Sequence, residues 1–227
     1  MKRTLVVIHS HAAANEMVKL MWPFYKLGGC DLLGVGRTNS KSEWPEPIAT
    51  ENIGIDLLKT WNEHKSDSLC RKLIDTMDVC ITNYPDYHNY CIIEWDQIFT
   101  STLPEYSGLF SGLVCHRTSP MCWGDARFKS PLAFIPPWRF DRKDAECLIT
   151  IGRKMIDEGD IELGTPDIFI GYAVHKAALP YSSIPVYFQC TIDRQEWRDE
   201  AREHFRKKDV ISIHGIKDAE TLNYITG

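Results

Sequence analysis

Leu5-Val6-Val7-Ile8, followed after a helical stretch by Asp31-Leu32-Leu33-Gly34-Val35-Gly36, decides the fold class of this 227-residue chain. The first run is continuously apolar, as in a strand that is buried on both faces. Residues 12–25 between the two runs suit a helix, and Gly28-Gly29 ends it. A strand, a helix and a second strand in such a short stretch predict a parallel α/β sheet.

The rest of the chain continues this mixture of strands and helices. Further strands are expected at 79–82, 90–93 and 112–115, and further helices at 52–64, 67–77, 142–157, 166–177 and 193–209. Residues 40–47 and 119–137 hold several prolines, and we expect irregular structure there. We therefore predict one α/β domain over residues 1–227, with a mixed central sheet flanked by helices.

Composition excludes several classes of function. A net charge of −5 argues against a general nucleic-acid binder, because phosphate neutralisation needs a surplus of lysine and arginine. No apolar run in the sequence reaches the roughly 18 residues of a membrane-spanning helix, and the first is too short for a signal peptide. We therefore expect a cytoplasmic protein without a membrane span. The eight cysteines form no C-x-x-C pair, which favours reduced structural thiols over a zinc cluster.

Two acidic residues, Glu94 and Asp96, stand where the apolar run 90–93 ends. Ligands of open α/β sheets collect at the carboxyl ends of strands. Because strand side chains alternate, we expect both carboxylates on one side and Trp95 on the other. Carboxylate pairs are natural ligands of Mg²⁺ or Mn²⁺, and such an ion would also accept diphosphate oxygens. Two acids that only end a strand and face water are the alternative.

The segment Ile92-Ile93-Glu94-Trp95-Asp96 resembles the Glu-x-Asp or Asp-x-Asp segment of glycosyltransferases with the GT-A fold. The resemblance implies a Rossmann-like nucleotide half near residues 1–100 and an acceptor half near residues 101–227. It also implies Asp96 as a metal ligand, Glu94 as a ligand of the metal or the ribose, and Trp95 beside the nucleotide sugar. In layout alone there is a weaker likeness to the small GT-A domains with which algal viruses glycosylate their capsids.

Two further segments extend the resemblance. Ile213-His214-Gly215-Ile216-Lys217 is similar to a late element in which a histidine ligates the metal and a lysine contacts the phosphates, although its spacing is shorter. Nucleotide contacts of the family follow the first two strands, which implies the same role for His9, Ser10, Arg37 and Thr38. The implied partners are a nucleoside-diphosphate sugar, with a UDP-sugar favoured, and a glycan or other hydroxyl acceptor.

Transfer to a hydroxyl also requires a group that takes up its proton, and an inverting enzyme positions a carboxylate for this purpose. The resemblance extends to Ile135-Pro136-Pro137-Trp138, the helix 142–157, a glycine-rich turn and Asp167 at the start of a helix, which implies Asp167 as the base. The alternative is that Asp167 only stabilises the helix start, where a carboxyl pKa tends to be lowered. Asp125 and Asp141 are lesser candidates.

Two other functions stay open on the sequence. His9-x-His11 after the first strand is similar to the histidine pair of metal-dependent hydrolases of the amidohydrolase type. Further ligands could come from His116, Asp167, His175 and His214. The chain is short for an eight-fold barrel, and its regular strand–helix alternation ends near residue 100. A non-catalytic nucleotide-binding module on the same fold is the second alternative.

Overall fold

The computed structural model describes residues 3–9, 15–37, 49–53, 65–104, 108–116, 132–159 and 166–227. The strands are β1 (Thr4–His9), β2 (Asp31–Arg37), β3 (Ala49–Ile53), β4 (Asn89–Glu94), β5 (Gln97–Phe99), β6 (Leu109–His116), β7 (Leu132–Asp141), β8 (Tyr181–Ser183), β9 (Val186–Phe188) and β10 (Ser212–His214). The helices are α1 (Asn15–Tyr25), the 3-10 turn η2 (Lys26–Gly28), α3 (Lys65–Asn83), α4 (Arg142–Asp157), α5 (Pro166–Lys176), α6 (Gln195–Lys207) and α7 (Ala219–Thr226).

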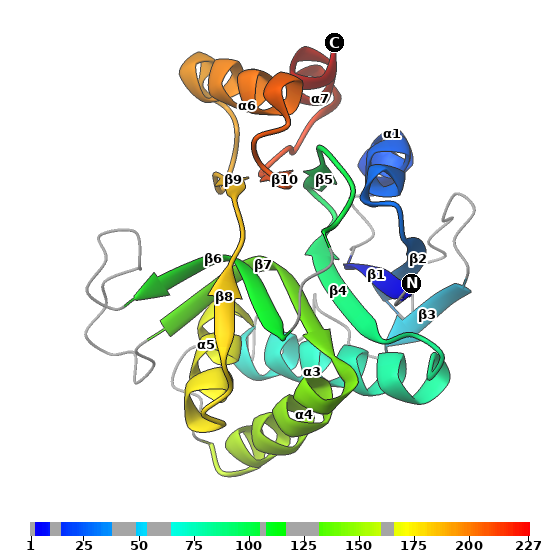
Figure 1. The fold of residues 1–227 in the computed structure, drawn as a ribbon, viewed down its shortest axis with the longest axis vertical. Coiled ribbons are helices and arrows are strands. Elements are labelled where there is room, and N and C mark those ends of the chain that lie inside the picture. Colours follow the sequence, from blue (N-terminus) through cyan, green and yellow to red (C-terminus); the bar gives the residue numbers. More distant parts are fainter. Residues whose placement is uncertain are drawn as a thin grey trace.

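The strands form two sheets. A seven-stranded sheet has the order β3-β2-β1-β4-β7-β6-β8, and a three-stranded sheet has the order β5-β10-β9. Helices α3, α4 and α5 cover one face of the larger sheet, while α1, the small sheet, α6 and α7 lie beyond the other (Figure 1). The predicted α/β class, with a mixed central sheet flanked by helices, is confirmed.

The β-α-β opening is also confirmed. β1 lies between β2 and β4 and is parallel to both, and residues 5–8 are fully buried. After α1 and η2 the chain turns at Gly29, whose φ of 68° lies in the left-handed region that glycine adopts without strain. Because the three strands are parallel, their carboxyl ends at His9, Arg37 and Glu94 lie at one edge of the sheet.

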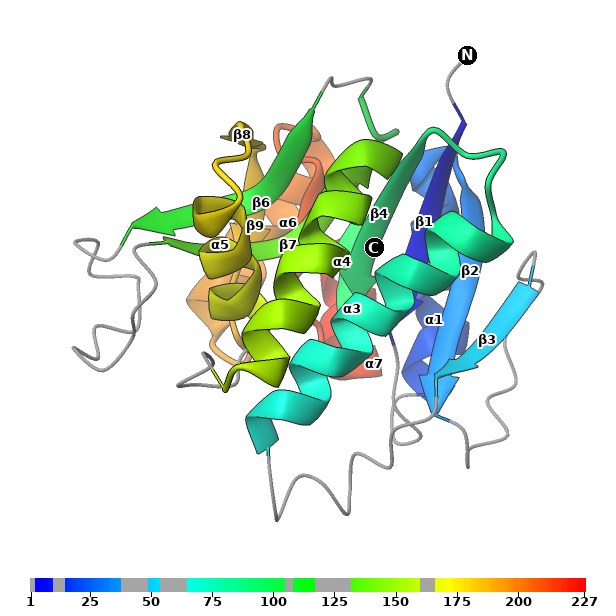
Figure 2. The ribbon, with the colours of Figure 1, turned by 90° about the horizontal axis from the view of Figure 1, so that it is seen from below.

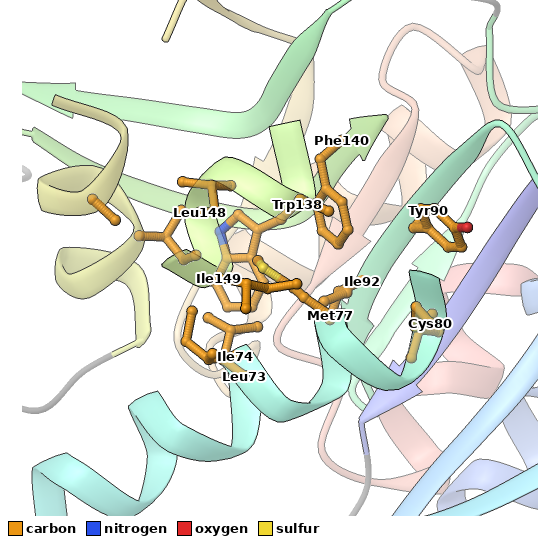
Figure 3. Close-up of a cluster of buried hydrophobic side chains, with 14 of the residues drawn as sticks. Leu73, Ile74, Met77, Cys80, Tyr90, Ile92, Trp138, Phe140, Leu148 and Ile149 are labelled. Carbon is orange, nitrogen blue, oxygen red and sulfur yellow. The ribbon is translucent and has the colours of Figure 1, made fainter. Parts of the chain in front are cut away.

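The strand predicted at residues 79–82 is wrong, because these residues form the last turn of α3. Cys70, Leu73, Ile74, Met77 and Cys80 are all buried and recur at helical spacing on the face turned to the larger sheet. Figure 3 shows Cys80 in line with Met77 and Ile74 on this helix. A four-residue apolar run does not distinguish strand from helix, and the periodicity of the residues before it decides.

Part of the predicted irregular stretch 119–137 is wrong as well, because residues 132–137 belong to β7. β7 is antiparallel to β4 on one side and to β6 on the other. The ladder with β6 shifts between Ser111 and Leu113, so that Pro136 and Pro137 together lie opposite Gly112. A bulge accommodates residues that have no N–H to donate, which explains how two prolines lie inside a buried strand.

The later helices follow the sequence closely. α4 has the predicted bounds, α5 begins at Pro166 as expected, and α6 lies inside the predicted 193–209. Figure 2 shows α3, α4 and α5 side by side over the larger sheet. Residues 52–53 of the helix predicted at 52–64 belong to β3, and the rest of it, with the loop 40–47, lies outside the described residues.

Two apolar cores lie on opposite faces of the larger sheet. One joins α3, α4 and α5 to the sheet and contains Trp138, which is 3% exposed. The other joins α1, the small sheet and α7 through residues such as Trp22, Phe99 and Ile213.

The six cysteines whose side chains are described carry free thiols, and only Cys190 among them is exposed. No helix in the described ranges is long and apolar enough to cross a membrane.

Alanine substitutions at Gly171 and Gly152 test how closely helix α5 packs against strand β7. A Cβ at Gly171 would lie 2.2 Å from the backbone oxygen of Leu132 in β7, whereas at Gly152 it would meet the end of the Ile74 side chain at 2.4 Å. Backbone cannot rotate away, so Gly171→Ala is expected to lower the free energy of unfolding by about 1–3 kcal/mol despite the better helix propensity of alanine. Gly152→Ala is the matched control and should lose less. Thermal unfolding of both variants measures the difference, and equal losses would contradict the close seat of α5 on β7.

Candidate metal centre at the carboxyl end of β4

The turn that follows β4 is held in place from two sides. Glu94 ends the strand, Trp95 and Asp96 form the turn, and β5 begins at the next residue. The Tyr25 hydroxyl at the end of α1 donates to the carbonyl oxygen of Trp95 at 2.5 Å. The amides of Gly215 and Ile216 donate to the carbonyl oxygen of Asp96 at 3.1 and 3.0 Å. The turn therefore has a defined conformation although it belongs to neither strand.

His214 brings the two acids together. Its Nε2 lies 2.7 Å from Oε2 of Glu94 and 3.4 Å from Oδ1 of Asp96. Its Nδ1 lies 3.0 Å from the carbonyl oxygen of Gln189, and the ring of Phe188 stacks on the imidazole at 4.7 Å. A carbonyl only accepts, so Nδ1 carries the proton donated to Gln189, and Nε2 is directed at the carboxylates. Both acids face this one histidine, and Asp96 reaches it from a turn and not by the strand alternation on which the sequence prediction rested.

Glu94, Asp96 and His214 fit a divalent cation. One ligand atom from each lies within 4.8 Å of the other two, and this is the one such group of three or more among the described histidines, cysteines and acids. Asp96 is fully buried, and its Oδ1 has no hydrogen-bond partner in the described part of the chain. A buried carboxylate oxygen without a partner is costly, and a coordinated cation would satisfy it. Two carboxylates and an imidazole are together able to hold a divalent metal ion.

Lys217 completes the group from the loop after β10. Its Nζ donates to Oδ2 of Asp96, and it lies 5.1 Å from the centre of the Trp95 ring. The loop between His214 and Lys217 turns at Gly215, whose φ is 97°. A Cβ at this position would lie 2.2 Å from the carbonyl oxygen of Gln189, which itself holds His214. Glycine is therefore required here both by φ and by space.

The charges of the site shift two pKa values. Burial disfavours the charged form of His214, but the carboxylate of Asp96 and the hydrogen bond to Glu94 outweigh it and raise the pKa of His214 to about 9. Burial, followed by the negative charge of Glu94, raises the pKa of Asp167 to about 8, while His214 acts in the opposite direction. The alternative for Asp167, a pKa lowered at a helix start, does not hold, because desolvation and a neighbouring carboxylate outweigh the helix macrodipole. Asp167, in the first turn of α5, thus belongs to the surroundings of the metal-ligand group.

Of the residues predicted from the nucleotide half, His9 and the backbone of Arg37 lie at the same edge of the sheet. His9 is paired with Glu94 across β1 and β4, and its Nε2 lies 3.0 Å from Oγ1 of Thr76. Burial, followed by the charge of Lys72, lowers the pKa of His9 well below its ordinary value. The backbone of Arg37 ends β2 at this edge. Ser10, His11 and Thr38 lie outside the described residues.

Two other sequence candidates, Asp141 and His175, lie away from the group. Asp141 caps the start of α4, where its Oδ1 accepts a hydrogen bond from the amide of Asp144 at 2.9 Å. Asp141 pairs with Asn89, at the end of β4 opposite to Glu94, and so does not lie where a base near Glu94 would. His175 is exposed in the last turn of α5. Asp125 lies outside the described residues, as does the side chain of His116.

Four residues of the site escaped the sequence motifs. Tyr25 holds the carbonyl of Trp95, while Phe188 and Gln189 hold the ring of His214. The exposed thiol of Cys190 is close enough to feel Asp167, Lys217 and Glu94, and burial together with these acids raises its pKa. No local pattern marks these four, because each acts through a residue distant in sequence.

Models of known protein families and curated proteins were also compared with the chain, and none matches it.

Alanine substitutions at Gly215 and Gly29 distinguish the cost of a positive φ from the cost of a steric clash with the Gln189 backbone. Both have positive φ, but a Cβ at Gly29 would meet only the side chain of Thr102, at 3.1 Å, whereas at Gly215 it would strike the Gln189 backbone. Positive φ costs a non-glycine residue about 1–2 kcal/mol, and overpacking adds about 1–3 kcal/mol. Gly215→Ala is thus expected to destabilise the protein more than Gly29→Ala in chemical denaturation. Equal destabilisation would show that the loop does not rest on Gln189.

Proposed function

We propose that this protein is a metal-dependent glycosyltransferase that moves a sugar from a nucleoside-diphosphate sugar, with a UDP-sugar favoured, to a hydroxyl acceptor. The observation that carries the proposal is the convergence of Glu94, Asp96 and His214 at the carboxyl edge of the parallel strands. Glu94 and His214 are 120 positions apart, so their meeting is a property of the fold and not of a local motif. The resemblance to GT-A enzymes rests on the same residues.

The metal-ligand group supports a role at the departing diphosphate. Mn²⁺ or Mg²⁺ held by Glu94, Asp96 and His214 would act as a Lewis acid that stabilises the charge of the leaving nucleoside diphosphate. Lys217 provides a further positive charge on the same side. His9 and the end of β2 lie along the same edge, where a nucleotide extending from the metal would contact them.

Asp167 is the proposed acceptor of the proton. In an inverting transfer the acceptor oxygen forms a bond to the anomeric carbon while the bond from that carbon to the diphosphate oxygen breaks. The hydroxyl proton then passes to a carboxylate on the acceptor side. Above about pH 8, where its carboxyl group is ionised, Asp167 is a stronger base than an ordinary aspartate, because burial and the charge of Glu94 raise its pKa.

Thermal unfolding with UDP and Mn²⁺ tests the donor and metal assignment. UDP with Mn²⁺ should raise the melting temperature of the wild type, since a ligand at 100 times its Kd stabilises the native state by about 2.7 kcal/mol. Asp96→Asn keeps the shape of the side chain but removes the charge, and it should abolish the Mn²⁺-dependent part of the shift. Asp157→Ala, at a carboxylate that is 71% exposed on α4, is the control and should retain it.

A second variant keeps the ligand assignment testable if Asp96→Asn fails to fold. Glu94 is 39% exposed and is more tolerant than Asp96, so Glu94→Gln should fold and bind more weakly. A full Mn²⁺-dependent shift in both variants contradicts the ligand assignment. Nucleotide binding without turnover across donors and acceptors would instead indicate a binding module, and a tightly bound zinc without any nucleotide effect would favour a hydrolase.

Asp167→Asn separates binding from transfer. The amide keeps the size of the carboxylate but cannot take up a proton, so kcat for UDP release from a UDP-sugar should fall by about 10²–10⁴-fold. The Mn²⁺-dependent melting shift with UDP should persist, because Asp167 is not among the three ligand residues. Wild-type turnover in this variant would remove Asp167 from the mechanism, and the matched variant Asp193→Asn, at an exposed acid, should have no effect.

A further inference from the structure

A pocket of about 440 Å³ lies at the end of β4 opposite to the metal-ligand group. Asn89 begins β4 and lines this pocket, whereas Glu94 ends the strand at the candidate metal centre. At about 3.3 Å per residue along a strand, the two residues lie about 16 Å apart. Figure 1 shows β4 leading away from the Asn89 end toward β5 and the small sheet. The pocket is therefore separate from the metal centre, and its volume is that of a small-molecule site.

Positive side chains outnumber negative ones in the lining of this pocket. Arg139, Arg142 and Lys143 line it together with two acids, Asp141 and Glu146. Asp141 is already engaged, because its Oδ1 accepts a hydrogen bond from an amide in the first turn of α4. None of the three cations forms an ion pair with a carboxylate in the described part of the chain. The lining thus carries an excess of positive charge that favours a negative ligand.

The guanidinium of Arg139 is buried although it lines the pocket. The residue is 5% exposed, and it donates to the carbonyl oxygen of Gly108 and to Oδ1 of Asn89, which are both neutral. The ring of Phe110 lies 5.4 Å from the guanidinium carbon. Burial lowers the pKa of Arg139, although the Cys91 thiol and two nearby aspartates act in the opposite direction. A buried cation is costly without a charged partner, and an oxyanion in the pocket would supply one.

The start of α4 places the other two cations at the same pocket. Arg142 and Lys143 are the first two residues of the helix, at the end where its macrodipole is positive. Arg142 is anchored by Nη2, which donates to the carbonyl oxygen of Ile81 at 2.7 Å. Lys143 is exposed, and its ammonium has no hydrogen-bond partner among the described residues. An arginine fork and a flexible lysine are a combination that suits phosphate and carboxylate groups.

We propose that this pocket is a second ligand site, which binds the phosphate or carboxylate group of a small organic molecule through Arg139 and Lys143. The size of the pocket favours an organic anion over a free ion. The inference goes beyond the proposed function and does not depend on it, because no residue of the metal-ligand group lines this pocket.

Titration with inorganic phosphate and with acetate tests the site. Each anion is added at constant ionic strength, and binding is followed by isothermal titration calorimetry. Excess EDTA is present, so that no divalent ion holds the anion at the metal-ligand group. The wild type should bind at least one of the two anions saturably. Tighter binding of phosphate assigns the site to a phosphate ester, and tighter binding of acetate assigns it to a carboxylate.

Variants at two exposed positions test the sign of the charge. Lys143→Met removes a positive charge and should weaken binding of the preferred anion about two- to fivefold, as is usual for an exposed ion pair. Glu146→Gln removes a negative charge from the same lining and should strengthen binding by a similar factor. Lys154→Met, at a lysine that is 70% exposed toward the other end of α4, is the matched control and should bind like the wild type.

Arg139→Gln tests the buried cation. Glutamine removes the positive charge, so the affinity for the anion should fall about tenfold or more, because a charged hydrogen bond in a buried setting is lost. Circular dichroism shows whether this variant folds, since Arg139 also holds Gly108 and Asn89. If it does not fold, the two exposed variants decide.

The outcomes separate the inference from its alternatives. Weaker anion binding in Lys143→Met together with tighter binding in Glu146→Gln supports the second site. A wild type that binds neither anion saturably overturns it, and so does equal affinity in Lys143→Met and Lys154→Met. Changes of the opposite sign in the two exposed variants also overturn it. The melting shift with UDP and Mn²⁺ is measured independently, so failure here leaves the proposed function in place.

Discussion

The carbonyl oxygen of Asp96 accepts hydrogen bonds from the amides of Gly215 and Ile216, and this contact joins two parts of the chain that carry the candidate site. It fixes the turn after β4 to the loop after β10. The pairing of β5 with β10 continues from it, with His214 opposite Gln97. Because both segments are held by backbone, the distances between Glu94, Asp96 and His214 do not depend on flexible side chains alone. The position of Lys217 follows from the same loop.

Electrostatics explain why the site needs this backbone support. Two like charges about 4 Å apart repel by ~4 kcal/mol at an effective dielectric constant of 20. Glu94 and Asp96 both face His214, and the negative charge of Glu94 also acts on Asp167. The imidazole and the Lys217 ammonium offset part of this repulsion. The group therefore does not stabilise the fold by itself; it is kept together by the two apolar cores and the sheet pairing.

Sequence patterns predicted the parts of the structure that depend on local order. The burial of residues 5–8 and the bounds of α4 follow from hydrophobic periodicity and helix capping. Residues 79–82 were misassigned because the helical spacing of Cys80 is visible only over the preceding turns of α3. β7 was missed because Pro136 and Pro137 argue against a strand until the bulge opposite Gly112 is known. Glu94 and His214 could be named from motifs, but their contact, and the roles of Phe188 and Gln189, depend on the pairing of the small sheet.

The connection between β8 and β9 sets how the proposed base and the metal-ligand group lie relative to each other. β8 belongs to the larger sheet and β9 to the small one, and Figure 1 shows them following one another from one sheet to the other. Between them, the amide of Ile184 donates to Ser111 in β6 at 3.0 Å, and the carbonyl of Pro185 accepts from Ile211 before β10 at 2.8 Å. The crossing is thus hydrogen-bonded to both sheets. α5, which carries Asp167, precedes β8, and His214 in β10 pairs with Phe188 in β9. Asp167 in helix α5 and His214 in the small sheet are thus linked through the chain that runs from α5 over β8 to β9.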